Sequence, residues 1–86
     1  MKEALLIIDV QNDYFQGGKM ELKNPLIAVE NIKKLLGKFR NEKKEIIFIK
    51  HIAVREDAGF FLKDTQGAEI YSEIFPHDSE KISSII

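Results

Sequence analysis

The sequence predicts an α/β fold built on a parallel sheet, and three observations support this prediction. Two short runs, residues 4–8 and 46–49, are apolar without polar alternation, which is typical of strands buried on both faces of a sheet. The segment between these runs has apolar residues at helical spacing. A strand, a helix and a strand of these lengths form a right-handed crossover unit with parallel strands.

Length and composition limit the chain to a single small domain. It has 86 residues, of which 44% are hydrophobic and 31% are charged, and it contains no cysteine. The apolar fraction is that of a folded protein. Without cysteine, these residues form no disulfide and supply neither a thiolate metal ligand nor a cysteine nucleophile. A domain of this size therefore depends on core packing, a metal or a partner for its stability.

Several classes of protein are excluded by the patterns of hydropathy and charge. Neither apolar run approaches the roughly 20 residues that span a bilayer, and the amino terminus lacks the features of a secretory signal. We therefore expect a cytoplasmic protein with no membrane partner. Lysine and arginine gather between residues 33 and 50, mostly on the polar face and carboxyl end of the predicted helix, where cations complement the helix dipole. We expect no nucleic-acid partner.

The first half of the chain contains a strand, a loop and a helix. The strand is expected over residues 3–10, and residues 11–23 form a loop with Gly17-Gly18 at its turn. Asn24 and Pro25 then supply a helix N-cap and a first-turn proline. The helix is expected over residues 25–41, with its apolar residues at Leu26, Val29, Ile32, Leu36 and Phe39.

The second half is less regular. A second buried strand is expected over residues 45–50, and residues 51–79 form a loop, with a short helical turn between residues 67 and 74. Residues 81–86 begin a third strand. No repeat or flexible linker divides the chain, so we treat residues 1–86 as a single domain that is incomplete at its third strand.

Candidate site residues follow the first strand. Ligands of open α/β sheets bind at the carboxyl ends of the strands, where Asp9 and the polar residues Gln11, Asn12 and Asp13 lie. A carboxylate at the end of a buried strand is expected to be partly desolvated, which suits Asp9 to general base catalysis. The alternative is an aspartate that caps a loop, and position alone favours neither. For Asp13, loop capping is the better explanation.

A second set of candidates follows the second strand. His51 reaches the same edge of the sheet, where an imidazole could move protons or contact a substrate; its alternative role is a hydrogen bond to a neighbouring loop. Phe60 and Phe61 could form the wall of an apolar pocket, or could pack the loop back on its own sheet.

The motifs resemble a known family. Residues 4–15, ALLIIDVQNDYF, closely resemble the opening of the isochorismatase-like cysteine hydrolases. Further motifs follow in the family's order: Gly17-Gly18, the Asn24-Pro25 helix start, the strand that ends at His51, Gly59-Phe60-Phe61, residues 65–70 and Pro76. The resemblance covers essentially the whole chain and corresponds to the amino-terminal half of the family domain. It implies a partial, doubly wound, three-layer Rossmann-like sheet, of which these residues supply the first two or three strands.

The resemblance also implies roles for individual residues. Members of this family carry an Asp, Lys, Cys triad and hydrolyse amides or, in the namesake, a vinyl ether. Asp9 would then be the catalytic base, and Phe15, His51, Phe60 and Phe61 would lie beside the substrate. The nicotinamidase subgroup adds a metal held by an Asp and two His around the second strand. Residues 49–51 lack that acid, so we predict no metal and no other cofactor.

The departures from the family pattern leave three interpretations. Residues 83–86 stand where the family has its lysine, Lys81 comes too early to replace it, and the cysteine is missing. The chain is therefore a family member truncated before Lys and Cys and inactive alone, or half of a cysteine hydrolase that another chain completes. The third interpretation is a receiver-like or other small α/β interaction domain. A receiver needs an adjacent acidic pair, whereas Asp9 and Asp13 are separated.

The resemblance further predicts how the chain associates. The first strand is central in the family sheet, with the second and third strands on one side only. Its other edge would be apolar and unpaired in this chain, which invites pairing with another polypeptide. We expect self-association or a complementing chain at this edge, and a small-molecule substrate once the site is complete.

Overall fold

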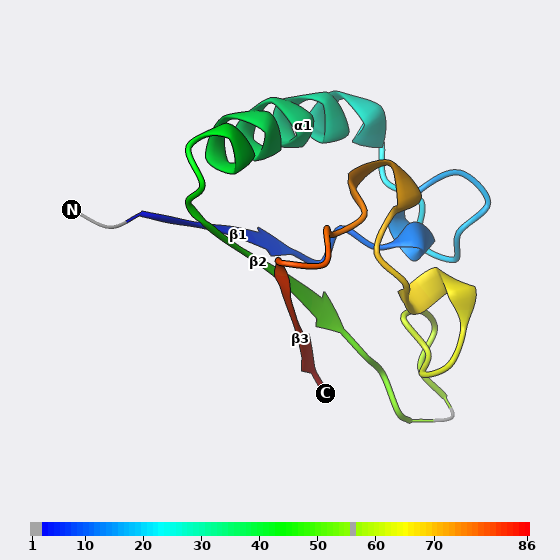
Figure 1. Cartoon of the computed structure of the whole chain (residues 1–86). Helices are drawn as coiled ribbons and strands as arrows, with labels where there is room; N and C mark the ends of the chain where they lie inside the picture. The colour runs from blue at the N-terminus through cyan, green and yellow to red at the C-terminus, as the bar shows by residue number, and fades with distance from the viewer. Residues whose placement is uncertain (1–2, 56) are drawn as a thin grey trace.

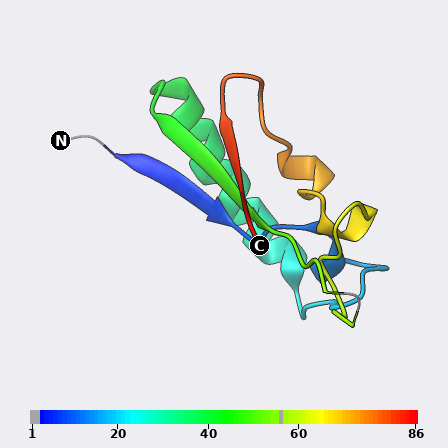
Figure 2. The same cartoon turned by 90° about the horizontal axis from the view of Figure 1, so that it is seen from below.

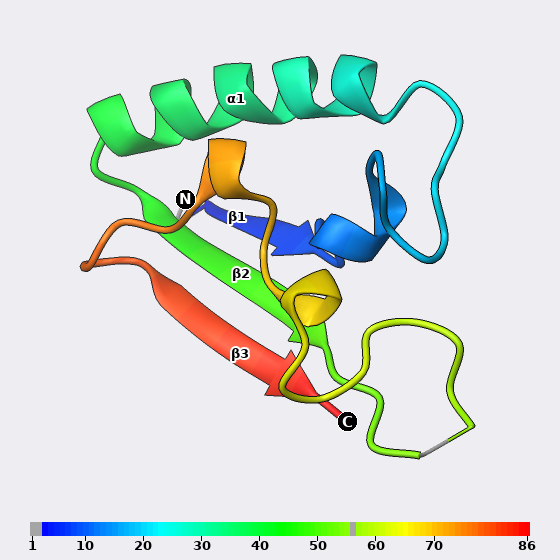
Figure 3. The same cartoon turned by 90° about the vertical axis from the view of Figure 1, so that its right-hand side faces the viewer.

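The computed structural model describes residues 3–55 and 57–86 and has one parallel sheet with strand order β1-β2-β3 (Figures 1 and 3). The predicted α/β class is confirmed. The regular elements are β1 (Ala4–Ile8), α1 (Pro25–Asn41), β2 (Glu45–His51) and β3 (Lys81–Ile85). Three short 3-10 turns accompany them: η1 (Asn12–Tyr14), η2 (Gln66–Ala68) and η3 (Ser72–Ile74).

The core lies between one face of the sheet and α1. Val29 and Leu36 of the helix are 1% and 2% exposed, and Phe48 of β2 is 1% exposed. The segment around η3 packs on the same side as α1, as Figure 1 shows. Leu26, in the first helical turn, is 57% exposed despite its place in the helical pattern. The core comprises Ile7, Phe15, Val29, Leu36, Ile46, Phe48, Ile70 and Ile74.

The opposite face of the sheet differs from the prediction. Apolar runs in the strands predicted helices on both faces, yet Leu6 and Ile8 of β1 are 52% and 55% exposed, and Ile85 of β3 is 53% exposed. Figure 2 looks toward this face and shows the strands in front of α1. Within residues 3–55 and 57–86, the sheet is thus covered by a helix on one face only. No helix in this part of the chain is long and apolar enough to cross a membrane.

The element ends differ slightly from the predicted ones. The helix has its predicted bounds, while β2 is one residue longer than predicted and β3 one residue shorter. β1 ends at Ile8 and not at residue 10, because Asp9 adopts a φ of +59° and turns the chain out of the sheet. Asn24 occupies the N-cap position, but with a φ of +54° and without a side-chain capping bond. Asparagine tolerates this left-handed conformation better than most residues do.

The entry to β3 is held by a bidentate ion pair between Arg40 and Glu80. The Nε and Nη2 groups of Arg40 donate to the two carboxylate oxygens of Glu80 at 2.7 and 2.8 Å. The main-chain N–H of His77 donates to the same carboxylate at 2.9 Å. The hydrogen bonds from Arg40 are the main cause that holds the pKa of Glu80 below its ordinary value of 4.5. The pair connects the last turn of α1 to the start of β3.

Replacing Glu80 tests this connection. A lowered carboxyl pKa stabilises the fold above the unfolded-state pKa and ceases to do so as the pH falls through the folded-state value. We expect Glu80→Gln to lower the free energy of unfolding by about 1–2 kcal/mol at pH 7, measured by urea denaturation. The difference from the wild type should shrink below pH 4.5. Glu73→Gln, which breaks a more exposed pair with Lys33, is the matched control and should change the unfolding free energy little. Equal effects of the two variants would contradict this prediction.

Candidate active site

Asp9 lies directly beyond the carboxyl end of β1 and faces an apolar cavity. Its main-chain N–H still donates to the Ile49 carbonyl of β2 at 2.9 Å, but its φ of +59° directs the following residues away from the sheet. Asp9 is half-buried and lines a cavity of about 380 Å³ together with Tyr14, Phe15 and the first turns of α1. A carboxylate in these surroundings can accept a proton from a group that enters the cavity.

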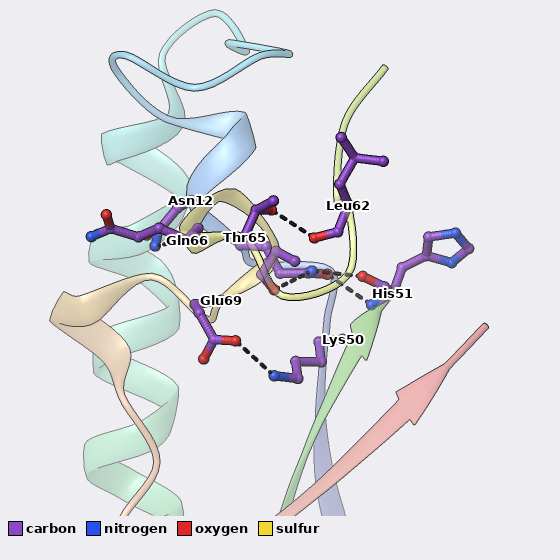
Figure 4. Close-up of polar contacts among 9 residues, drawn as sticks. Asn12, Lys50, His51, Leu62, Thr65, Gln66 and Glu69 are labelled. Atoms are coloured by element: carbon purple, nitrogen blue, oxygen red, sulfur yellow. Dashed lines mark hydrogen bonds and ion pairs between the residues drawn. The ribbon is translucent and has the colours of Figure 1, made fainter. Parts of the chain in front are cut away.

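His51 and Phe60 line a different cavity. This space, of about 510 Å³, lies beyond the end of β2, beside residues 52–55 and 57–60, and its walls are mostly apolar. The imidazole of His51 is exposed, and Figure 4 shows it pointing away from the hydrogen bonds made by its own main chain. Arg55 and Asp57, which also line this cavity, form an exposed ion pair at 3.0 Å. The structure therefore groups Phe15 with Asp9, and Phe60 with His51.

Phe61 is buried between these two groups. Its side chain is 1% exposed, so it contributes to packing more than to an accessible wall. The ring makes edge contacts with Tyr14 and Phe60 at centroid distances of 4.9 and 4.8 Å, and it lies 6.1 Å from the His51 ring. The buried Phe61 ring thus contacts Tyr14, which lines the Asp9 cavity, and Phe60 and His51, which line the other. Phe15 is also buried and stacks on Tyr71 at 3.7 Å.

Asp13 has the loop-capping role predicted for it. It is 4% exposed, and its carboxylate accepts hydrogen bonds from the main-chain N–H groups of Phe61, at 2.7 Å, and Lys19, at 3.1 Å. Both oxygens are thus engaged in joining two loops. Among residues 3–55 and 57–86, no three His, Cys, Asp or Glu side chains are grouped so that they could hold a metal ion.

The sequence placed Gln11 at this edge of the sheet but did not predict its structural role. Its side chain is completely buried and bonds to both the N–H and the carbonyl of His51, at 2.8 Å each, and to the carbonyl of Ala68 at 2.6 Å. Figure 4 shows the bonds at His51 beside two neighbouring contacts, between Asn12 and Gln66 and between Lys50 and Glu69. The available signal was an amide three residues beyond the end of β1, next to other polar residues.

Comparisons with known proteins agree on the family. A family model of the isochorismatase domain matches residues 3–83. An uncharacterized isochorismatase family protein, YddQ, of Bacillus subtilis (strain 168) is 44% identical over 82 residues, which are 95% of this chain and 46% of that protein. A solved structure from Oleispira antarctica, named as an isochorismatase hydrolase, superposes with a TM-score of 0.87 at 35% identity and covers 95% of this chain and 45% of its own.

A more distant structure shows the same fold. The N-carbamoylsarcosine amidase of Thermoplasma acidophilum superposes with a TM-score of 0.89 at 20% identity, over 99% of this chain and 52% of its own. The chain thus spans about half the length of the relatives that it matches. Sequence identity over nearly the whole chain, the match of the family model and the parallel sheet lead to the same conclusion. The chain belongs to the isochorismatase family.

Proposed function

We propose that this chain supplies the Asp9 side of a hydrolytic site of the isochorismatase type, and that hydrolysis requires a lysine and a cysteine from polypeptide outside these 86 residues. The observation that carries the proposal is the position of Asp9, half-buried at the carboxyl end of β1 and facing an apolar cavity. A base in this position activates a thiol that enters the cavity. These residues contain no cysteine, so they are inactive by themselves under this proposal.

The edge of β1 that faces away from β2 supports the proposal, because it offers a place where the missing residues can bind. Because the N–H of Asp9 points to β2, the alternation of a strand directs the main-chain groups of Leu6 and Ile8 to the other side. β1 has β2 as its single sheet neighbour in the described part of the chain. A shallow apolar groove of about 180 Å³ follows this edge and shares Ile8, Val10 and Ile32 with the Asp9 cavity.

An added strand is the occupant that this edge fits best. A strand pairing with β1 gains main-chain hydrogen bonds and places alternate side chains in the groove. If it runs parallel to β1, its carboxyl end lies beside Asp9. A second copy of this chain brings no cysteine, whereas a complementing polypeptide with the remaining family residues can supply the thiol. The complementing polypeptide is therefore the partner that we propose for activity.

Reconstitution tests the proposal. This chain is co-expressed with the part of the Bacillus subtilis relative that it does not match, and hydrolysis of small amides and vinyl ethers is measured. We expect turnover from the complex and none from either part alone. Asp9→Asn in this chain should lower kcat by about 100-fold or more, because the loss of a general base has effects of that order.

The controls separate catalysis from assembly. Asp64→Asn changes an exposed carboxylate that lines neither the Asp9 cavity nor the His51 cavity, and it should leave kcat unchanged. Gel filtration should show the wild type and the Asp9→Asn variant binding the complementing part equally well. Turnover by this chain alone, or full activity of the Asp9→Asn complex, would refute the proposal.

A further inference from the structure

The ladder between β1 and β2 is interrupted at Asp9. Its register runs from Ala4 opposite Glu45 to Ile8 opposite Ile49. In a regular parallel continuation of the ladder, the Asp9 N–H donates to the Ile49 carbonyl, the His51 N–H donates to the Asp9 carbonyl, and the N–H of residue 11 donates to the His51 carbonyl. The first of these bonds is present at 2.9 Å.

Beyond that bond the main chain takes another course. The φ of +59° at Asp9 turns the chain toward residues 69–71. There the Tyr71 N–H donates to the Val10 carbonyl at 3.0 Å, and the Asn12 N–H donates to the Glu69 carbonyl at 2.9 Å. The main chain of residues 10–12 thus pairs with the η2–η3 segment instead of continuing along β2. The N–H and carbonyl of His51 need other partners, because buried main-chain groups are costly to leave unpaired.

The side chain of Gln11 provides those partners. Its Oε1 accepts from the His51 N–H at 2.8 Å, in place of the Asp9 carbonyl. Its Nε2 donates to the His51 carbonyl at 2.8 Å, in place of a main-chain N–H, and to the Ala68 carbonyl at 2.6 Å. The amide therefore takes the place of a peptide group in the sheet. A carboxylate only accepts hydrogen bonds and an ammonium only donates them, so an amide meets this requirement where neither ion does.

We infer that Gln11 is a positioning residue whose amide replaces two main-chain hydrogen bonds of the β1–β2 ladder. Because the Gln11 amide makes these bonds, the Asp9 main chain is free to take the left-handed conformation in which Asp9 faces its cavity. It also fixes the main chain of His51 at the end of β2, beside the second cavity. The catalytic importance of this arrangement rests on the proposed function, but the coupling of Gln11 to Asp9 and His51 is testable in the isolated chain.

Gln11→Glu is the informative variant, because it keeps the size of the side chain. The ionised carboxylate loses both donated bonds and faces the carbonyls of His51 and Ala68. Repulsion from these two carbonyls moves the carboxylate away, so the His51 N–H loses its acceptor as well. Protonation gives the side chain one O–H donor and one carbonyl acceptor, which restores the pair of bonds to His51. Amide hydrogen exchange by NMR measures the result as protection factors, compared with the wild type at each pH.

At pH 7 we expect the protection factor of the His51 amide to fall at least 10-fold more than that of Leu36 in α1. We also expect the Asp9 amide and Cα resonances to shift. Both effects should reverse as the pH is lowered and the introduced carboxylate takes up a proton. Gln11→Leu, which cannot be protonated, should show the loss without the reversal. Asn12→Asp makes the same amide-to-acid change at a neighbouring, more exposed position and should leave His51 unchanged.

The exchange results either support or overturn the positioning role of Gln11. Equal losses of protection at His51 and Leu36, or an unchanged His51 amide in Gln11→Glu, would mean that Gln11 only fills the core. If Gln11→Glu is unfolded at pH 7, far-UV circular dichroism replaces exchange as the measurement. Refolding on acidification in Gln11→Glu and not in Gln11→Leu then supports the inference, and failure of both to refold overturns it. Because the readout needs no turnover, a failed reconstitution would leave this result standing.

Discussion

Asp13→Ala is expected to lower the free energy of unfolding by about 2–4 kcal/mol, because it removes a buried acceptor from two loops at once. The carboxylate accepts from the Phe61 N–H at 2.7 Å and from the Lys19 N–H at 3.1 Å. Phe61 itself has a φ of +57°, a conformation that costs a non-glycine residue about 1–2 kcal/mol. The bond from Asp13 offsets part of this strain and holds the Phe61 main chain in place. Urea denaturation followed by circular dichroism measures the loss.

A matched pair of amide variants isolates the role of the Asp13 charge. Asp13→Asn retains one acceptor oxygen but turns an NH2 group toward a main-chain donor, so we expect a loss smaller than that of Asp13→Ala. Asp64→Asn makes the same change at an exposed residue. The φ of Asp64 is +63°, a left-handed conformation that asparagine tolerates. Its effect should stay within about 0.5 kcal/mol, as for most surface substitutions. A large loss in Asp64→Asn, or none in Asp13→Ala, would contradict the assignment.

The regular elements could be predicted because their signals are local. The helix bounds follow from Pro25 at its start and from apolar residues three and four positions apart. The two apolar runs indicated strands of a parallel sheet, and the strand order β1-β2-β3 is the one that the resemblance to the family implies. Coverage of both sheet faces was predicted from the same runs and is not found in the described residues. An apolar run shows that a strand face avoids water, but it does not show which polypeptide covers that face.

The arrangement of the site could not be predicted, because it depends on contacts between residues far apart in the chain. Asp9 and His51 were correctly placed at one edge of the sheet, yet they line different cavities. The left-handed turn at Asp9 depends on Gln11, whose partners are 40 and 57 residues away. The sequence allowed Phe61 either to form a pocket wall or to pack the loop on the sheet; its side chain is buried, and its N–H bonds to Asp13, 48 residues earlier. The roles of Asp9, Phe15, His51, Phe60 and Phe61 in catalysis and binding stay predictions.

Gly67→Ala is expected to lower the free energy of unfolding by about 1–3 kcal/mol, as overpacking typically does. A Cβ built on Gly67 would overlap the carboxylate of Asp13, which is held by two main-chain donors and cannot move aside freely. Gly37→Ala is the matched control. It lies in α1 with open space around it, so the same substitution should stabilise the helix by about 0.5–1 kcal/mol. Two identical substitutions should therefore change stability in opposite directions, as measured by urea denaturation.

Measuring Gly67→Ala in the Asp13→Ala variant decides whether the overlap with Asp13 causes the loss of stability. Asp13→Ala removes the atoms that the new methyl group would meet, so Gly67→Ala should cost less than about 0.5 kcal/mol when it is added to that variant. The two changes would then be non-additive by about 1–2 kcal/mol, which is the mark of residues in direct contact. If Gly67→Ala costs the same in both backgrounds, the penalty arises from the η2 main chain and not from Asp13. Non-additivity would show that Gly67 is required because it lets the η2 turn approach the buried carboxylate that joins the two loops.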